Sequence, residues 1–222
     1  MVNNKSVIIG YDAVSPLGTD MDVFDDSWAY YPNIMAQKGA FVLEPNYHGS
    51  ANYGQAFAES IKGKYYELEV PDILAGVDAL IAKGWVDPDK LGTIGWSNGG
   101  ILSIALTTWT KRFKAAGIGA ADVNWTSDYG NCSFGVSFDN YYFKGAPWDQ
   151  LEHYIQKSPL FYLKDMKVPT IIFHGTEDTS VPYEQGWEYY RASSRSARRR
   201  CVSSSSPANP IAWANTPINL ER

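Results

Sequence analysis

Short apolar runs alternate along the chain with longer segments in which apolar residues recur every three or four positions. Residues 69–83 show the second pattern, which predicts a helix with Pro71 in its first turn and an end at Gly84. The apolar face of this helix consists of Ile73, Val77, Leu80 and Ile81. Further helices are expected over residues 97–108 and 181–190.

The short apolar runs between these helices predict strands. They cover residues 38–43, 91–94, 113–118 and 170–174. Strands that alternate with helices predict an α/β fold, with a mostly parallel sheet covered by helices on both faces and a site at the carboxyl ends of the strands. Residues 119–147, rich in Asp, Asn, Gly and aromatic residues, are expected to form a long irregular segment of functional importance.

Residues 95–100 place Ser97 between Gly95 and Gly99, directly after a predicted strand and before a predicted helix. Glycines permit a sharp strand-to-helix turn that lifts the serine hydroxyl out of the sheet, and the amides of the following helix can face a developing oxyanion. We interpret the segment as a nucleophile elbow. The alternative is an ordinary glycine-rich turn, because the bare motif also occurs by chance.

A carboxylate that could support a catalytic base follows the last predicted strand. Asp178 lies in a turn 81 residues after Ser97, and its alternative role is to cap the helix that follows. The chain has three histidines, and all of them precede Asp178, whereas a triad base is expected after the acid. We expect a strand-end structural role for His174, a surface role for His48 and an exposed position for His153, so none is a good base.

Composition limits the possible partners and cofactors. The 222 residues, 45% of them hydrophobic, suit one α/β domain, and a net charge of -5 offers no basic field for nucleic acid. No apolar run is long enough for a membrane span, and the first residues are not typical of a signal peptide, so we expect a cytoplasmic protein that acts on a peptide or small acyl substrate. Cys132 and Cys201 are expected to be unrelated thiols, and no metal or cofactor motif is present.

Basic residues divide the chain near residue 191. Residues 191–222 contain six of the seven Arg and none of the twelve Lys, with four consecutive serines at 203–206. We therefore expect a hydrolase domain over residues 1–192, which is incomplete, and a disordered basic tail over residues 193–222.

Several motifs accompany the elbow between residues 20 and 192. They are residues 45–54 (PNYHGSANYG), 72–84 followed by 86–91 (VDPDKL), 157–159 (KSP), and 174–178 (HGTED) followed by Val181 and Pro182. Together with the elbow they resemble the catalytic α/β-hydrolase domain of the prolyl oligopeptidase family of serine peptidases, which includes dipeptidyl peptidases and acylaminoacyl peptidases. The resemblance implies that Ser97 is the nucleophile, Asp178 the acid, and the Asn98 amide an oxyanion donor.

The chain departs from the family pattern in two places. The aromatic or histidine residue followed by Gly-Gly-Pro near the start is replaced, which leaves Tyr11 as a weak candidate for the second oxyanion donor. The family's histidine, some 30 to 35 residues after the acid, is also missing. We hypothesise that the tail is a frameshifted translation of the lost strand and histidine loop. When the tail is back-translated with permitted codons and then read from the third base of codon 192, it can give FKQIGKAPVRFLLFPGEPH. This string contains an apolar strand followed by a histidine at the family's spacing.

The expected function is that of a serine-type peptidase that forms an acyl-enzyme on Ser97, with activity reduced or lost without the histidine. Two alternatives stay open. One is a carboxylesterase of the same fold, which would share the serine and the acid. The other is a non-catalytic relative, which the missing histidine favours and the intact elbow opposes.

Overall fold

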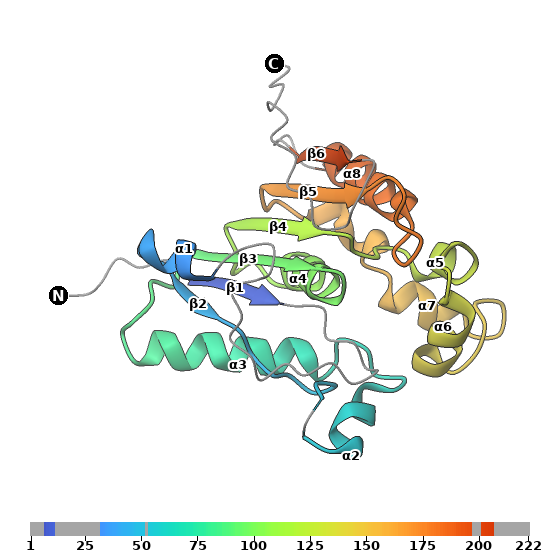
Figure 1. Ribbon diagram of the computed structural model, residues 1–222, viewed down its shortest axis with the longest axis horizontal. Coiled ribbons are helices and arrows are strands. Elements are labelled where there is room, and N and C mark those ends of the chain that lie inside the picture. Colours follow the sequence, from blue (N-terminus) through green and yellow to red (C-terminus); the bar gives the residue numbers. More distant parts are fainter. Residues whose placement is uncertain (1–6, 12–31, 52, 197–200, 207–222) are drawn as a thin grey trace.

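The computed structural model of the chain describes residues 7–11, 32–51, 53–196 and 201–206. In these residues six parallel strands form one sheet in the order β2-β1-β3-β4-β5-β6 (Figure 1). The strands are β1 Val7–Tyr11, β2 Phe41–Leu43, β3 Leu91–Trp96, β4 Ala115–Gly119, β5 Thr170–Gly175 and β6 Cys201–Ser206. The parallel sheet confirms the predicted α/β-hydrolase class, because parallel neighbours need crossover connections, which helices supply here.

Helices fill the connections between the strands. They are α1 Pro32–Gln37, α2 Gln55–Ala58, α3 Glu69–Ala82, α4 Asn98–Trp109, α5 Trp125–Asn131, α6 Gly135–Phe143, α7 Leu151–Lys157 and α8 Tyr183–Ser196, with 3₁₀ turns η1 Glu59–Ile61 and η2 Pro159–Asp165. Helix α4 packs on β3 and β4, and α8 packs on β5 and β6. In the part of the chain that the structure describes, no helix is long and apolar enough to cross a membrane.

Helix α4 is the centre of the core. Its residues from Gly99 to Thr107 are all buried, which explains why its sequence is apolar on every side rather than on one face. Two polar side chains enter this core and pair with each other, since Thr93 Oγ1 of β3 lies 2.8 Å from Ser103 Oγ of α4. The pair satisfies hydroxyl groups that would otherwise be buried at a cost in stability.

Residues 119–147 differ from the predicted irregular segment, because they contain the short helices α5 and α6. The side chain of Asn124 caps α5 by accepting a hydrogen bond from Thr126 N at 3.3 Å. Long-range aromatic packing holds the two helices together, with the rings of Trp125 and Phe138 stacked at 5.9 Å between centroids. The prediction was wrong because this stabilisation is tertiary and leaves no helical periodicity in the sequence.

The tail also differs from the expected disorder in the parts that the structure describes. Helix α8 continues to Ser196, and the hydroxyl of the buried Ser193 donates to Tyr189 O at 2.7 Å. Cys201–Ser206 forms β6, which pairs in parallel register with β5. Backbone hydrogen bonding to an open sheet edge needs little from the side chains, so even a serine run can serve as a strand.

Gly100 marks the closest approach of α4 to the end of β4. A Cβ at this position would come within 2.5 Å of Gly119 O and 2.8 Å of Ala121 Cβ. We expect Gly100→Ala to lower the free energy of unfolding by about 1–3 kcal/mol, because the packed backbone has to move. Urea denaturation measures the effect.

The matched control is Gly130→Ala in α5, where an added Cβ meets nothing within 4 Å. This variant should change the free energy of unfolding by less than about 1 kcal/mol. Equal losses in the two variants would contradict the close approach of α4 to β4.

Candidate active site

Ser97 occupies a sharp bend between β3 and α4. Its backbone angles are φ 52° and ψ -124°, a combination that residues other than glycine rarely adopt and that costs about 1–3 kcal/mol. The bend is fixed to the neighbouring strand, since Ser97 N donates to Gly119 O at 2.9 Å. Strain of this kind is typical of functional positions, so the geometry agrees with a nucleophile elbow.

Glycine is required beside this bend. A Cβ on Gly95 would lie 2.3 Å from the carbonyl carbon of Gly99 and 2.9 Å from Gly100 N, closer than real Cβ contacts. The backbone at the end of β3 therefore packs closely against the backbone of the first turn of α4. The catalytic roles of Ser97 and of the flanking glycines stay predictions that this geometry supports.

Asn98 is the first residue of α4, where backbone amides have no partner within the helix and the helix dipole is positive. Its side chain is held from two sides, because Nδ2 donates to Tyr47 OH at 3.0 Å and Oδ1 accepts from Tyr65 OH. Tyr47 and Tyr65 are both buried. The two tyrosines thus anchor the residue whose amide is the predicted oxyanion donor.

The second predicted donor, Tyr11, ends β1. Its backbone pairs in register with Gly95, next to the end of β3, so Tyr11 lies at the same edge of the sheet as Ser97. This placement is the one that an oxyanion contribution requires. The donor role itself stays a prediction.

Asp178 lies in the turn after β5, which is separated from β3 by β4 alone. Its Oδ1 accepts hydrogen bonds from Ser180 N and Val181 N, both at 2.9 Å. These two amides precede α8, so the carboxylate holds the turn before the helix through one of its oxygens, and the acid role of Asp178 stays a prediction. Ser180 and Val181 line the same pocket as Ser97, so the Asp178 loop borders the candidate site.

Ser97 and Asn98 open into a pocket of about 760 Å³. Its wall is mainly aromatic and aliphatic. The lining residues come chiefly from η1, α4, α5 and α6. The main apolar contributors are Tyr65, Ile101, Trp125, Phe138, Tyr142 and Val181. A pocket of this size, with a mainly apolar wall and several polar groups in its lining, suits part of a small substrate.

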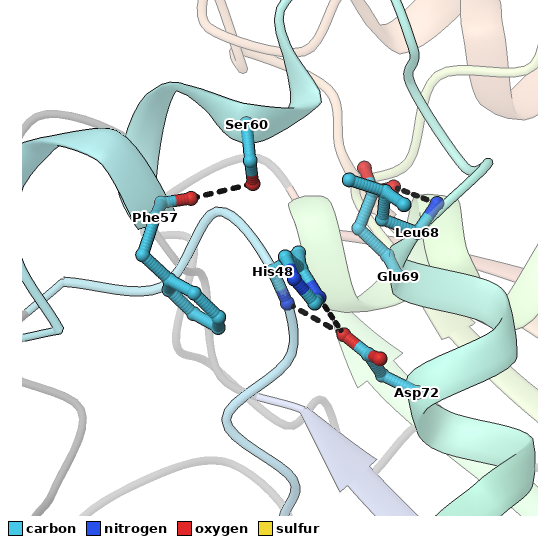
Figure 2. Close-up of polar contacts among 6 residues, drawn as sticks. All are labelled: His48, Phe57, Ser60, Leu68, Glu69 and Asp72. Atoms are coloured by element: carbon cyan, nitrogen blue, oxygen red, sulfur yellow. Dashed lines mark hydrogen bonds and ion pairs between the residues drawn. The ribbon is translucent and has the colours of Figure 1, made fainter.

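His48 is bound to the carboxylate of Asp72 (Figure 2). Its Nδ1 lies 2.5 Å from Asp72 Oδ2, its backbone N donates to the same oxygen at 2.8 Å, and its ring stacks on Phe57 at 4.5 Å between centroids. Neither His48 nor Asp72 lines the pocket that holds Ser97. The pair instead ties the loop after β2 to α3, in agreement with the expected surface role.

The other two histidines are also outside the pocket. His174 is buried, donates from Nε2 to Val181 O at 2.9 Å, and has a pKa lowered by burial, as expected of a structural residue. His153 was expected to be exposed, but it is half-buried, packs its ring against Phe143 at 5.8 Å between centroids, and has a pKa lowered by burial. The exposure prediction was wrong because α7 packs against α5 and η2.

Three buried carboxyl groups escaped the sequence analysis. Asp122 and Asp128 line the pocket, and Asp139 lies fully buried on α6. Burial, followed by the charge of Asp128, raises the pKa of Asp139 to about 9, and burial raises the pKa of Asp128 to about 6. Their only signal in the sequence was the abundance of Asp in a segment without clear periodicity.

The fold defines this chain as an α/β-hydrolase, and the strained backbone of Ser97 agrees with the predicted nucleophile elbow. The model of the prolyl oligopeptidase family matches residues 27–199, and the chain belongs to this family. The match includes the elbow and the Asp178 loop.

The curated relatives are peptidases that are much longer than this chain. The uncharacterized peptidase YuxL of Bacillus subtilis is 32% identical over 160 residues, which cover 72% of this chain and 24% of the relative. The acylamino-acid-releasing enzyme of Arabidopsis thaliana is 32% identical over 191 residues, covering 82% and 24%. The chain thus spans about a quarter of the length of these relatives.

Solved structures of acylaminoacyl peptidases share the fold. The Pyrococcus horikoshii enzyme matches with a TM-score of 0.84 at 26% identity, over 93% of this chain and 33% of that one. An acylaminoacyl peptidase in complex with Z-Gly-Gly-Phe-chloromethyl ketone matches with a TM-score of 0.85 at 25% identity and the same coverage. The chain therefore shares the architecture of about a third of each of these peptidases.

The raised pKa of Asp139 predicts a pH-dependent stability. A folded state that keeps a proton up to about pH 9, while the unfolded chain releases it near pH 4, loses stability as the pH rises between these values. Asp139→Asn removes this titration. Between pH 4 and pH 8, the free energy of unfolding of the variant should therefore fall less than that of the wild type. The difference between the two falls should be on the order of a few kcal/mol.

Urea denaturation at several pH values measures this difference in slope. The exposed Asp149 supplies the control, since Asp149→Asn should leave the pH dependence of the wild type unchanged. Parallel curves for wild type and Asp139→Asn would contradict a buried carboxyl with a raised pKa.

Proposed function

We propose that this chain is the nucleophile-bearing domain of a serine peptidase that forms an acyl-enzyme on Ser97. The observation that carries the proposal is the strained backbone of Ser97 at a position that lines a pocket of about 760 Å³. Membership of the prolyl oligopeptidase family supports the same chemistry.

The reaction begins with attack of Ser97 Oγ on a peptide carbonyl carbon. Negative charge then develops on the carbonyl oxygen, and the proposed donor to it is the amide of Asn98, the first residue of α4. The Tyr47 and Tyr65 hydroxyls, which fix the Asn98 side chain, limit movement of this donor. Release of the amine leaves the acyl group on Ser97, and water hydrolyses the ester.

Asp178 is the proposed partner of a general base. One of its oxygens accepts two backbone hydrogen bonds, which orient the group. The other oxygen is left for an imidazole. Among the described residues, however, no histidine lines the pocket, so the proton of Ser97 has no efficient acceptor there.

The substrate is proposed to be a peptide. The relatives whose names state an activity are acylamino-acid-releasing enzymes and a dipeptidyl peptidase, and their structural counterparts are acylaminoacyl peptidases. These names favour peptide bonds over the simple esters of a carboxylesterase. The alternative of a non-catalytic relative is decided by the reactivity of Ser97.

A fluorophosphonate probe tests the nucleophile. The wild-type chain should be labelled at one site, and Ser97→Ala should abolish the labelling because it removes the attacking oxygen. Intact-mass spectrometry measures the modification.

The matched control is Ser137→Ala. It removes another hydroxyl from the lining of the same pocket, one that donates a hydrogen bond to Phe134 O. Labelling should survive in this variant. A folded wild-type chain that stays unlabelled would refute the proposed catalysis and favour a binding role.

The lack of a histidine near Ser97 predicts slow labelling that added imidazole accelerates. Free imidazole can accept the proton in place of a side chain, and a general base contributes about 10²–10⁴ in rate, so an increase of tenfold or more is expected at high imidazole concentration. The rate of probe incorporation is measured with and without imidazole, and Ser97→Ala is the control.

Fast labelling that does not respond to imidazole would mean that a base is already present.

The coding DNA around codon 192 tests the proposed origin of the missing histidine. An insertion or deletion of one base relative to close relatives is expected there, and an unbroken reading frame would refute the frameshift.

A further inference from the structure

The pocket beside Ser97 has an acidic side within an otherwise apolar wall. Its lining residues include three carboxylates, from Glu59, Asp122 and Asp128, and no lysine, arginine or histidine among the described residues. A carboxyl group in an apolar pocket is costly unless it meets a donor or a cation. The charge of the lining therefore indicates what the pocket accepts.

Asp122 and Asp128 carry the argument because both are buried and incompletely bonded. Their exposed fractions are 5% and 2%, and Oδ1 of each has no hydrogen-bond partner within the described part of the chain. Buried polar atoms in folded proteins are nearly always paired, so two orphaned acceptors in one pocket need an explanation. A ligand that brings its own donors supplies one.

The two carboxyl groups are also coupled to each other. Burial raises the pKa of both groups, and the charge of Asp128 raises that of Asp122 further. Asp139 interacts electrostatically with both, and neither of its oxygens is bonded in the described residues. Three acids in one apolar region form an environment that a positive charge would stabilise.

The rest of the pocket fits the stem of such a ligand. Tyr65, Trp125 and Phe138 offer ring faces and edges to methylene groups, and aromatic faces also attract cations. A side chain with an apolar stem and a cationic tip would bury its stem on these rings and give its protons to the carboxyl oxygens.

We propose that this pocket is the subsite for a basic, lysine- or arginine-like side chain of the substrate next to the scissile bond, with Asp122 and Asp128 as its specificity determinants. The inference rests on the proposed peptidase function, which it deepens by naming the substrate class. A purely apolar side chain fits the walls but leaves the two carboxyl groups buried without a donor, and this costs binding energy.

A binding experiment tests the subsite without relying on catalysis. Acetyl-Gly-Gly-Lys methylamide and its norleucine analogue differ only in the ammonium group, and isothermal titration calorimetry measures their affinities for the full chain at pH 8. The lysine peptide should bind at least tenfold tighter. Equal or tighter binding of the norleucine peptide would overturn the proposal and mean that water or a shared proton is enough for the carboxyl groups. Absence of binding by both peptides would overturn it as well.

Variants assign the preference to the two residues. In the double variant Asp122→Asn/Asp128→Asn, the ratio of the affinities for the lysine and norleucine peptides should fall at least tenfold. Asp122→Leu should shift the preference toward the norleucine peptide. The exposed Asp149, which does not line the pocket, supplies the control Asp149→Asn, which should behave as the wild type. A lysine preference that survives in the folded double variant would overturn the assignment.

The wild-type comparison of the two peptides stands even where a variant fails to fold. The outcome is also separable from that of the proposed function. Fluorophosphonate labelling of Ser97 without a lysine preference refutes the subsite alone. A lysine preference without labelling refutes catalysis and leaves a pocket selective for basic side chains.

Discussion

The contact between the end of β3 and the start of α4 is the constraint on which the site depends. A Cβ added to Gly95 would lie 2.3 Å from the carbonyl carbon of Gly99, so only glycine fits beside the strained backbone of Ser97. The hydrogen bond from Ser97 N to Gly119 O fixes the bend to β4. Because α4 is buried from Gly99 to Thr107, the surrounding core opposes relaxation of this strain, and Ser97 keeps its place in the pocket lining.

Around this bend, the supporting structure is aromatic and tyrosine-rich. Tyr47 and Tyr65 hold the side chain of Asn98, while the indole of Trp125 donates to Tyr66 OH at 3.0 Å. These contacts join the loop after β2, the turn before α3 and the start of α5 to the elbow. The predicted oxyanion donor is thus positioned by residues far away in the sequence, as preorganised electrostatic stabilisation requires.

Charge in this region follows from the same packing. Burial of Asp122, Asp128 and Asp139 among aromatic rings raises their pKa values and leaves oxygens without partners in the described residues. Such groups lower the stability of the folded chain above pH 4, so they are better explained by a ligand than by folding. The family fold supplies the scaffold, and this acidic side of the pocket supplies its selectivity.

The sequence by itself determined the α/β class and the family, and it predicted the elbow at Ser97 and the acid at Asp178, because glycine sterics, apolar periodicity and turn chemistry act over a few residues. It also set the absence of any histidine after His174. Only the tertiary structure decided that residues 119–147 form helices, that His153 is half-buried, that Cys201–Ser206 joins the sheet as β6, and that three aspartates gather beside the pocket. These features depend on burial and strand pairing between distant segments, which leave no periodic signal in the local sequence.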